Sequence, residues 1–154
     1  MPVYFFDTSA IVKRYARETG SAWITTISNP VIGNPIYLAR ITEVETVSAI
    51  TRQARENRIL ASDAATAINM FRYDFANHYR KVEITPVLID KAVTLAQDYA
   101  LRGYDAVQLA AVLQVSSDRL SREMSDIILI SADVELNAAA NAEGLAVDDP
   151  NSHS

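Results

Sequence analysis

The sequence predicts an α/β protein in which helices cover both faces of a mostly parallel central sheet, a three-layer α/β/α sandwich. Short runs of aliphatic or aromatic residues alternate with longer amphipathic stretches, and Val3–Phe6 and Ile127–Ile130 are the clearest of these runs. Both are apolar throughout, which is typical of strands buried on both faces. Strands separated by helices favour parallel pairing through crossover connections.

The remaining elements follow from periodicity and from turn residues. Two prolines, a glycine and two asparagines mark Asn29–Pro35 as a loop, Pro86 suits a first helical turn, and Gly103 and Gly144 are expected to end helices. We expect strands at 3–6, 36–39, 81–84, 127–130 and 145–147, and helices following Asp7–Ser9, at 21–28, 42–57, 62–78, 86–101, from Tyr104–Asp105 onward, and from Asp133 to 143.

Length and composition indicate one globular domain, and they exclude several kinds of site. The chain has 154 residues, of which 49% are hydrophobic, and it shows no apolar run long enough to cross a bilayer and no signal peptide, so we expect a cytoplasmic protein. It contains no cysteine and only two histidines, of which His153 is expected to lie in a frayed tail. The net charge of −5 argues against a passive nucleic-acid binder with a broad basic face, but it is compatible with a nuclease whose carboxylates bind cations.

Acidic residues directly follow two of the predicted parallel strands. Asp7 and Asp133 each follow a predicted strand, so both belong on the same edge of the sheet, and Asp105 opens a helix. Each of these residues also fits the simpler role of a helix N-cap. A fourth acid comes from Glu43 or Glu45, which flank a stripe of Ile41, Val44 and Val47; spacing does not distinguish the two glutamates, and either also fits a solvated flank.

A cluster of carboxylates favours metal-assisted hydrolysis over the other common mechanisms. The chain has no glycine-rich phosphate loop, no GxSxG turn and no thiol, and His78 has no partner pattern that would make it a serine-triad base. Carboxylates that lie close together repel one another unless a cation lies among them, and hard oxygen ligands suit Mg²⁺ or Mn²⁺. Such ions activate water and stabilise the leaving oxygen of a phosphodiester.

Four segments, in order, resemble the PIN-domain nucleases and specifically the VapC-like toxins of toxin–antitoxin pairs. The segments are FFDTSAIVKRY (5–15), ITEVETVSAITR (41–52), YDAVQLAAVL (104–113) and LISADVELNAAANAEGLAV (129–147). The resemblance implies that residues 1–148 form a single PIN domain, followed by a polar C-terminal tail at 149–154.

The resemblance also assigns the site. It implies that Asp7, Glu45, Asp105 and Asp133 are the catalytic, metal-binding acids, with Thr8 or Ser9 and Ser131 in support. Glu45 is preferred to Glu43 because Ser48, Ala49 and Ile50 follow it in the family's pattern. It implies further an Mg²⁺- or Mn²⁺-dependent endoribonuclease toxin, a homodimer, and a cognate antitoxin that inserts a basic residue near the carboxylates.

Two groups of basic residues are candidates for holding RNA, although a solvated helical face explains either group equally simply. Lys13 and Arg14, with Arg17, follow Asp7, and Arg52, Arg55 and Arg58 lie at the end of the Glu45 helix. Packing is favoured over base stacking for Tyr104, and Phe71, Tyr73, Phe75 and Tyr79 are expected in the core or a dimer interface.

Two other functions remain open. One is a PIN fold that binds RNA or serves as a scaffold without catalysis, which the presence of all four acids disfavours. The other is a phosphatase with an aspartyl nucleophile, which usually carries a second acid two residues later, where this chain has Ser9.

Overall fold

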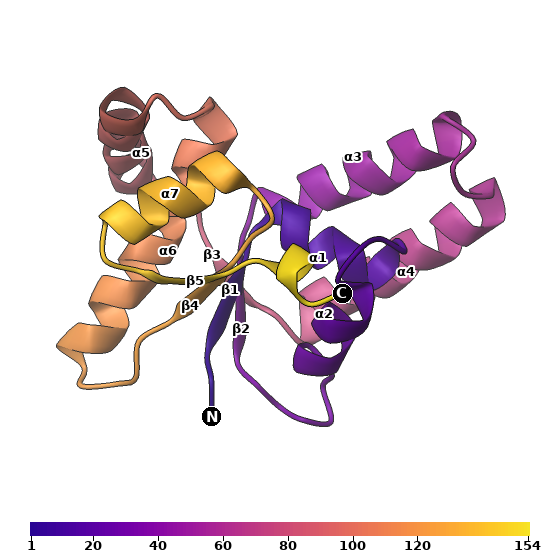
Figure 1. Ribbon diagram of the computed structural model, residues 1–154, viewed down its shortest axis with the longest axis horizontal. Helices are drawn as coiled ribbons and strands as arrows, with labels where there is room; N and C mark the ends of the chain where they lie inside the picture. The colour runs from indigo at the N-terminus through magenta and orange to yellow at the C-terminus, as the bar shows by residue number, and fades with distance from the viewer.

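The computed structural model describes all residues 1–154 and has an α/β fold (Figure 1). The strands are β1 (Tyr4–Phe6), β2 (Ile36–Ala39), β3 (Arg80–Val82), β4 (Ile128–Ile130) and β5 (Ala146–Asp148). The helices are α1 (Thr8–Tyr15), α2 (Ser21–Ile27), α3 (Thr42–Arg55), α4 (Ala61–Asn77), α5 (Pro86–Tyr99), α6 (Gly103–Ser121) and α7 (Val134–Ala142), with a final 3₁₀ turn at Pro150–Ser152.

The sheet is parallel throughout and its strand order is β3-β2-β1-β4-β5. The chain builds outward from β1 to the edge strand β3, then crosses back and places β4 on the other side of β1. In open parallel sheets such a reversal leaves a crevice beyond the carboxyl ends of the two strands, and ligands bind there. The fold therefore directs attention to the residues that follow β1 and β4.

Helices cover both faces of the sheet, which confirms the three-layer arrangement (Figure 1). Alternate residues of one strand point to opposite faces, so Phe5 packs with residues of α5, α6 and α7, whereas Phe6 packs with residues of α1, α2 and α4. Both phenylalanines are fully buried. Burial on both faces explains why the strands are apolar at every position.

Three details differ from the sequence-based expectations. The edge strands β3 and β5 each begin one residue from the expected start. Gly103 does not end a helix: Ala100 adopts the left-handed conformation after α5 (φ 54°), and Gly103 is the first residue of α6. On α3 the buried residues are Thr42, Thr46 and Ile50, and Val44 is exposed, so the expected apolar stripe through Val44 is wrong.

The C-terminal residues are ordered against α2, and the expectation that they fray is wrong. The His153 ring stacks on Trp23 with 3.7 Å between centroids, and His153 Nε2 lies 2.7 Å from Asp148 Oδ1. Pro150 is buried, and its carbonyl lies so close to Gly20 that a Cβ there would be 2.3 Å from the oxygen. None of the helices is long and apolar enough to cross a membrane.

Candidate active site

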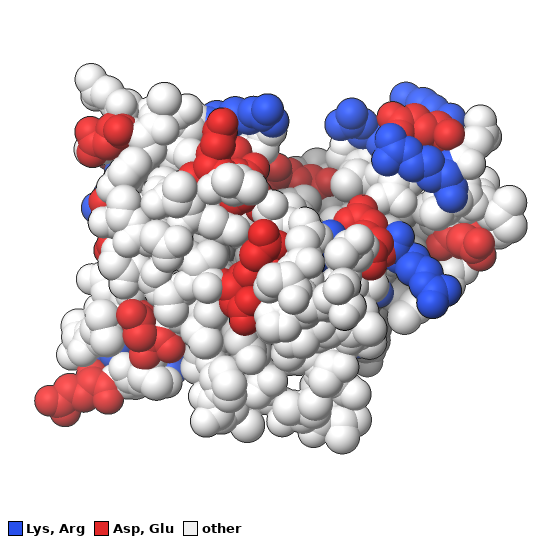
Figure 2. Space-filling model, in the orientation of Figure 1, with Lys and Arg blue, Asp and Glu red and all other residues white.

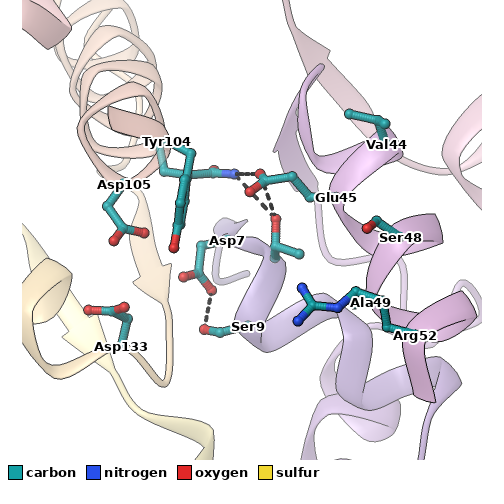
Figure 3. A pocket seen from close by; sticks show the side chains of 12 residues that line it. Asp7, Ser9, Val44, Glu45, Ser48, Ala49, Arg52, Tyr104, Asp105 and Asp133 are labelled. Carbon is teal, nitrogen blue, oxygen red and sulfur yellow. Dashed lines mark hydrogen bonds between the residues drawn. The ribbon is translucent and has the colours of Figure 1, made fainter. Parts of the chain in front are cut away.

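A cleft of about 530 Å³ opens where the order of the strands reverses, between α3 and the first turns of α6 and α7. All four acids singled out from the sequence line it, and they come from four separate segments of the chain (Figure 3). Its lining residues are Asp7, Thr8, Ser9, Val44, Glu45, Ser48, Ala49, Arg52, Tyr104, Asp105, Gln108 and Asp133. In the space-filling view, acidic atoms are visible at the floor of a notch between the two wings of the molecule (Figure 2).

Asp7 lies between β1 and α1 and is nearly inaccessible to solvent. It does cap α1, because its Oδ1 accepts a hydrogen bond from the Ala10 backbone N–H at 3.0 Å. The same oxygen accepts from Ser9 Oγ at 2.7 Å, and Oδ2 accepts from Ser131 Oγ at 2.8 Å. Burial raises the pKa of Asp7 to about 7; the three hydrogen bonds lower it, and the charge of Asp105 raises it further.

The pairing of β1 with β4 explains the contact between Asp7 and Ser131. Phe6 is directly paired with Ile130, so the residues that follow them emerge side by side. Ser131 Oγ also accepts from the Asp133 backbone N–H at 3.1 Å, and Asp133 caps α7 by accepting from the Leu136 N–H at 2.8 Å. The sequence-predicted supporting residues Ser9 and Ser131 thus connect the ends of the two strands.

Asp105 has no capping role, unlike Asp7 and Asp133. It is the third residue of α6, whose N-cap position is Arg102 without a side-chain hydrogen bond. Burial raises its pKa to about 6, with Asp133 and Glu45 also raising it and Arg102 lowering it. A buried carboxylate that caps no helix and lies near other acids is unfavourable to ionise, and such groups are typical of functional sites.

Glu45 lines the cleft and Glu43 does not. Glu45 Oε1 accepts from Thr8 Oγ1 at 2.9 Å and from Gln108 Nε2 at 3.1 Å. Gln108 also donates to Thr42 Oγ1 at 2.9 Å, and its own Oε1 is buried without a partner. Sequence reasoning missed Gln108; its position one helical turn after Asp105, on the same face of α6, was the available signal.

Comparison with known proteins identifies the family of the chain. The chain is 32% identical over 147 residues, 96% of its length and 95% of theirs, to two proteins of Mycobacterium tuberculosis, Ribonuclease VapC45 (strain CDC 1551 / Oshkosh) and Ribonuclease VapC49 (strain ATCC 25618 / H37Rv). The chain belongs to the VapC family of PIN-domain proteins. No protein-family model matches it.

Solved structures agree on the VapC fold. PAE2754 from Pyrobaculum aerophilum superposes with a TM-score of 0.65 at 20% identity, over 99% of this chain and 86% of the other. A chain from a toxin-antitoxin complex of Klebsiella pneumoniae gives 0.56 at 18% identity, covering 96% and 97% of the two chains. FitAcB from Neisseria gonorrhoeae gives 0.56 at 15% identity, over 96% and 98%.

The donor set of this VapC cleft suits a hard divalent cation that retains part of its water shell. The side-chain oxygens belong to carboxylates, hydroxyls and the Gln108 amide. The charge of Asp105 raises the pKa of Asp7, and the charges of Asp133 and Glu45 raise the pKa of Asp105. No three of the acidic side chains are close enough together to hold one ion among them directly. Mg²⁺ is commonly bound through only one or two carboxylates and keeps several waters, so this looser arrangement fits it.

The basic residues expected near Asp7 do not reach the VapC cleft. Lys13 is buried and pairs with Glu18 at 3.1 Å, while Arg14 donates to Ser28 Oγ at 2.8 Å and lies 3.9 Å from Asp74. Neither lines the cleft.

Two further side chains line the cleft, one from α3 and one from α6. Arg52 lines the cleft from α3. Tyr104 also lines it and is 44% exposed, so the expected packing role for Tyr104 is wrong.

The other aromatic residues lie mostly in the core, away from the cleft. Phe71, Phe75 and Tyr79 are buried there, as expected, whereas Tyr73 is exposed.

Proposed function

We propose that this chain is a metal-dependent endoribonuclease that acts as a toxin and is neutralised by a cognate antitoxin. The observation that carries the proposal is the convergence of Asp7, Glu45, Asp105 and Asp133 in one cleft at the carboxyl ends of β1 and β4. Two of these residues, Glu45 and Asp105, cap no helix. The curated relatives are named ribonucleases, which supports RNA as the substrate.

The protein's own residues account for binding of the cation and for control of protons. Asp7, Asp105, Asp133 and Glu45 would hold Mg²⁺ or Mn²⁺, directly or through water, and the ion would supply an activated water and stabilise the leaving oxygen. Ser9 and Ser131 orient the Asp7 carboxylate, and Thr8 and Gln108 orient that of Glu45. Because the pKa of Asp7 is about 7, its carboxyl group is partly protonated at neutral pH, and a bound cation would favour the ionised form.

The negative charge of the same cleft supports an antitoxin protein as the partner. A neighbouring structure is a toxin-antitoxin complex, and another is described as FitAB bound to a DNA fragment. We propose that the antitoxin of this chain covers the acidic cleft with a basic side chain, which would compete with the cation for the same carboxylates. The homodimer implied by the family stays a prediction.

Cleavage of single-stranded RNA by the purified protein tests the proposal. We expect cleavage with Mg²⁺, loss of cleavage in excess EDTA and recovery with Mn²⁺. Asp105→Asn should reduce cleavage to background, whereas the matched control Asp90→Asn, which removes an exposed carboxylate from α5, should retain full activity.

Expression in growing cells, alone and together with a candidate antitoxin, tests the toxin role. Arrest with degraded RNA, relieved by the antitoxin, is expected. Arrest with intact RNA would contradict the proposal and favour a PIN fold that acts without catalysis. Cleavage unaffected by Asp105→Asn would contradict the proposed site.

A further inference from the structure

Arg52 is the one Lys or Arg side chain that lines the cleft. It is exposed on α3, on the wall opposite Asp105 and Asp133, and its guanidinium points toward the side that carries Ser9 (Figure 3). Figure 2 shows that basic atoms gather over the same wing of the molecule as α3, facing the acidic floor of the notch. The α3 wall of the cleft therefore carries one basic side chain, Arg52, in addition to the acid Glu45.

The charge of Arg52 is not matched within the protein. Some cations of the chain have carboxylate partners, among them Lys13 with Glu18, Arg40 with Glu83 and Arg58 with Glu56. Others have none, and of these only Arg52 lines the cleft. Arg52 forms no ion pair, and its guanidinium donates no hydrogen bond. An extended, unpaired arginine that lines a cleft is available to a ligand.

Neutralising the catalytic acids does not explain Arg52. No carboxylate of the cleft lies within ion-pair distance of it, and the positive charge that lowers the pKa of Asp105 is that of Arg102. The open space of the cleft thus separates Arg52 from Asp105 and Asp133, and a bound strand would lie in that space.

We propose that Arg52, together with the hydroxyl of Ser48, binds a backbone phosphate of single-stranded RNA next to the scissile phosphate at the carboxylates. Ser48 lines the cleft one helical turn before Arg52, so both side chains lie on the same face of α3. A guanidinium matches a phosphate through two parallel N–H donors, and a hydroxyl adds a third. This subsite positions the strand without reading its bases. The inference rests on the proposed ribonuclease function and specifies how that substrate is held.

Salt-dependent binding of a mixed-sequence single-stranded RNA tests the subsite. The measurements use protein carrying Asp105→Asn, in Mg²⁺, so that the RNA is not cut. Removing one phosphate contact lowers the slope of log Kd against log salt by about 0.7 for single strands. We expect that change for Arg52→Gln, with affinity about tenfold weaker at low salt because a charged hydrogen-bonded contact is lost.

Two further variants separate a specific contact from a general field. Arg55→Gln makes the same change in charge on the same helix, but Arg55 does not line the cleft, so the slope should stay as in the parent. Arg52→Lys keeps a cation at the site and should keep the slope. The exposed Arg52 side chain forms no hydrogen bond or ion pair, so we expect Arg52→Gln to leave the thermal unfolding midpoint unchanged. That result will show that the fold is intact.

Any of the following results would overturn the proposed phosphate subsite. Equal losses in Arg52→Gln and Arg55→Gln would mean a diffuse field, and no loss in Arg52→Gln would remove the contact. Unchanged RNA binding with weakened antitoxin binding would assign Arg52 to the protein partner instead. Failure of the Asp105→Asn parent to bind RNA at all would refute the proposed substrate itself, which distinguishes the two failures.

Discussion

Replacing Asp7 by asparagine should abolish cleavage and, at alkaline pH, make the protein more stable. Asparagine caps helices as well as aspartate does, so α1 keeps its hydrogen bond from the Ala10 N–H. What the substitution removes is the charge. The pKa of Asp7 is raised from 3.8 to about 7 by burial, so ionisation of this group opposes folding.

The sign and size of the effect follow from linkage. Between about pH 5 and pH 7 the unfolded chain has lost this proton and the folded protein still holds it, so the stability of the wild type falls as pH rises. One proton corresponds to about 1.4 kcal/mol per pH unit, hence about 3 kcal/mol over this window, and the slope ends above the folded pKa. Asparagine does not ionise, so Asp7→Asn has no such pH dependence. From pH 5 to pH 8 the free energy of unfolding of the variant should therefore rise by about 3 kcal/mol relative to that of the wild type.

Urea unfolding in EDTA at pH 5, 6, 7 and 8, followed by far-UV circular dichroism, measures this difference. Asp90→Asn removes an exposed carboxylate and serves as the control, with no pH-dependent gain. If the difference in unfolding free energy between Asp7→Asn and wild type were the same at pH 5 and pH 8, the raised pKa of Asp7 in the folded protein would be refuted. A stable fold with no cleavage would separate the catalytic role of Asp7 from its capping role.

Three more outcomes are expected. Glu45→Gln should reduce cleavage far more than Glu43→Gln, because only Glu45 of the two lines the cleft. Equal losses of the two variants in a cleavage assay would refute the choice of Glu45 over Glu43. Mg²⁺ should raise the thermal unfolding midpoint more at pH 8 than at pH 6, since below its pKa of about 7 the proton on Asp7 competes with the ion; equal rises would exclude Asp7 as a ligand. Gly20→Ala should destabilise the fold by at least about 1–3 kcal/mol, the cost of its positive φ alone, because the new Cβ also meets the Pro150 carbonyl. Gly103→Ala, with no neighbour within 4 Å, should be nearly neutral in the same urea titration, and similar losses in both would refute the close approach at Gly20.

Local pattern was sufficient for the architecture. Strands buried on both faces must be apolar at every position, so Val3–Phe6 and Ile127–Ile130 were recognisable without any partner. Polar residues directly after such strands lie at one edge of a parallel sheet, and for that reason Asp7, Ser131 and Asp133 were correctly placed together. The ordered motifs identified the family, and the comparison with VapC ribonucleases confirmed it.

Tertiary packing decided what each polar side chain is free to do. Lys13 and Arg52 look alike as basic residues on helices near an acid, yet Lys13 is buried against Glu18 and Arg52 is exposed in the cleft. The sequence places Gln108 on the same face of α6 as Asp105, but it does not reveal the hydrogen bonds of Gln108 to Glu45 and Thr42, because those partners lie 63 and 66 residues away. Periodicity encodes which face of an element is buried, but the partner of a polar group depends on distances between elements, and those exist only once the chain has folded.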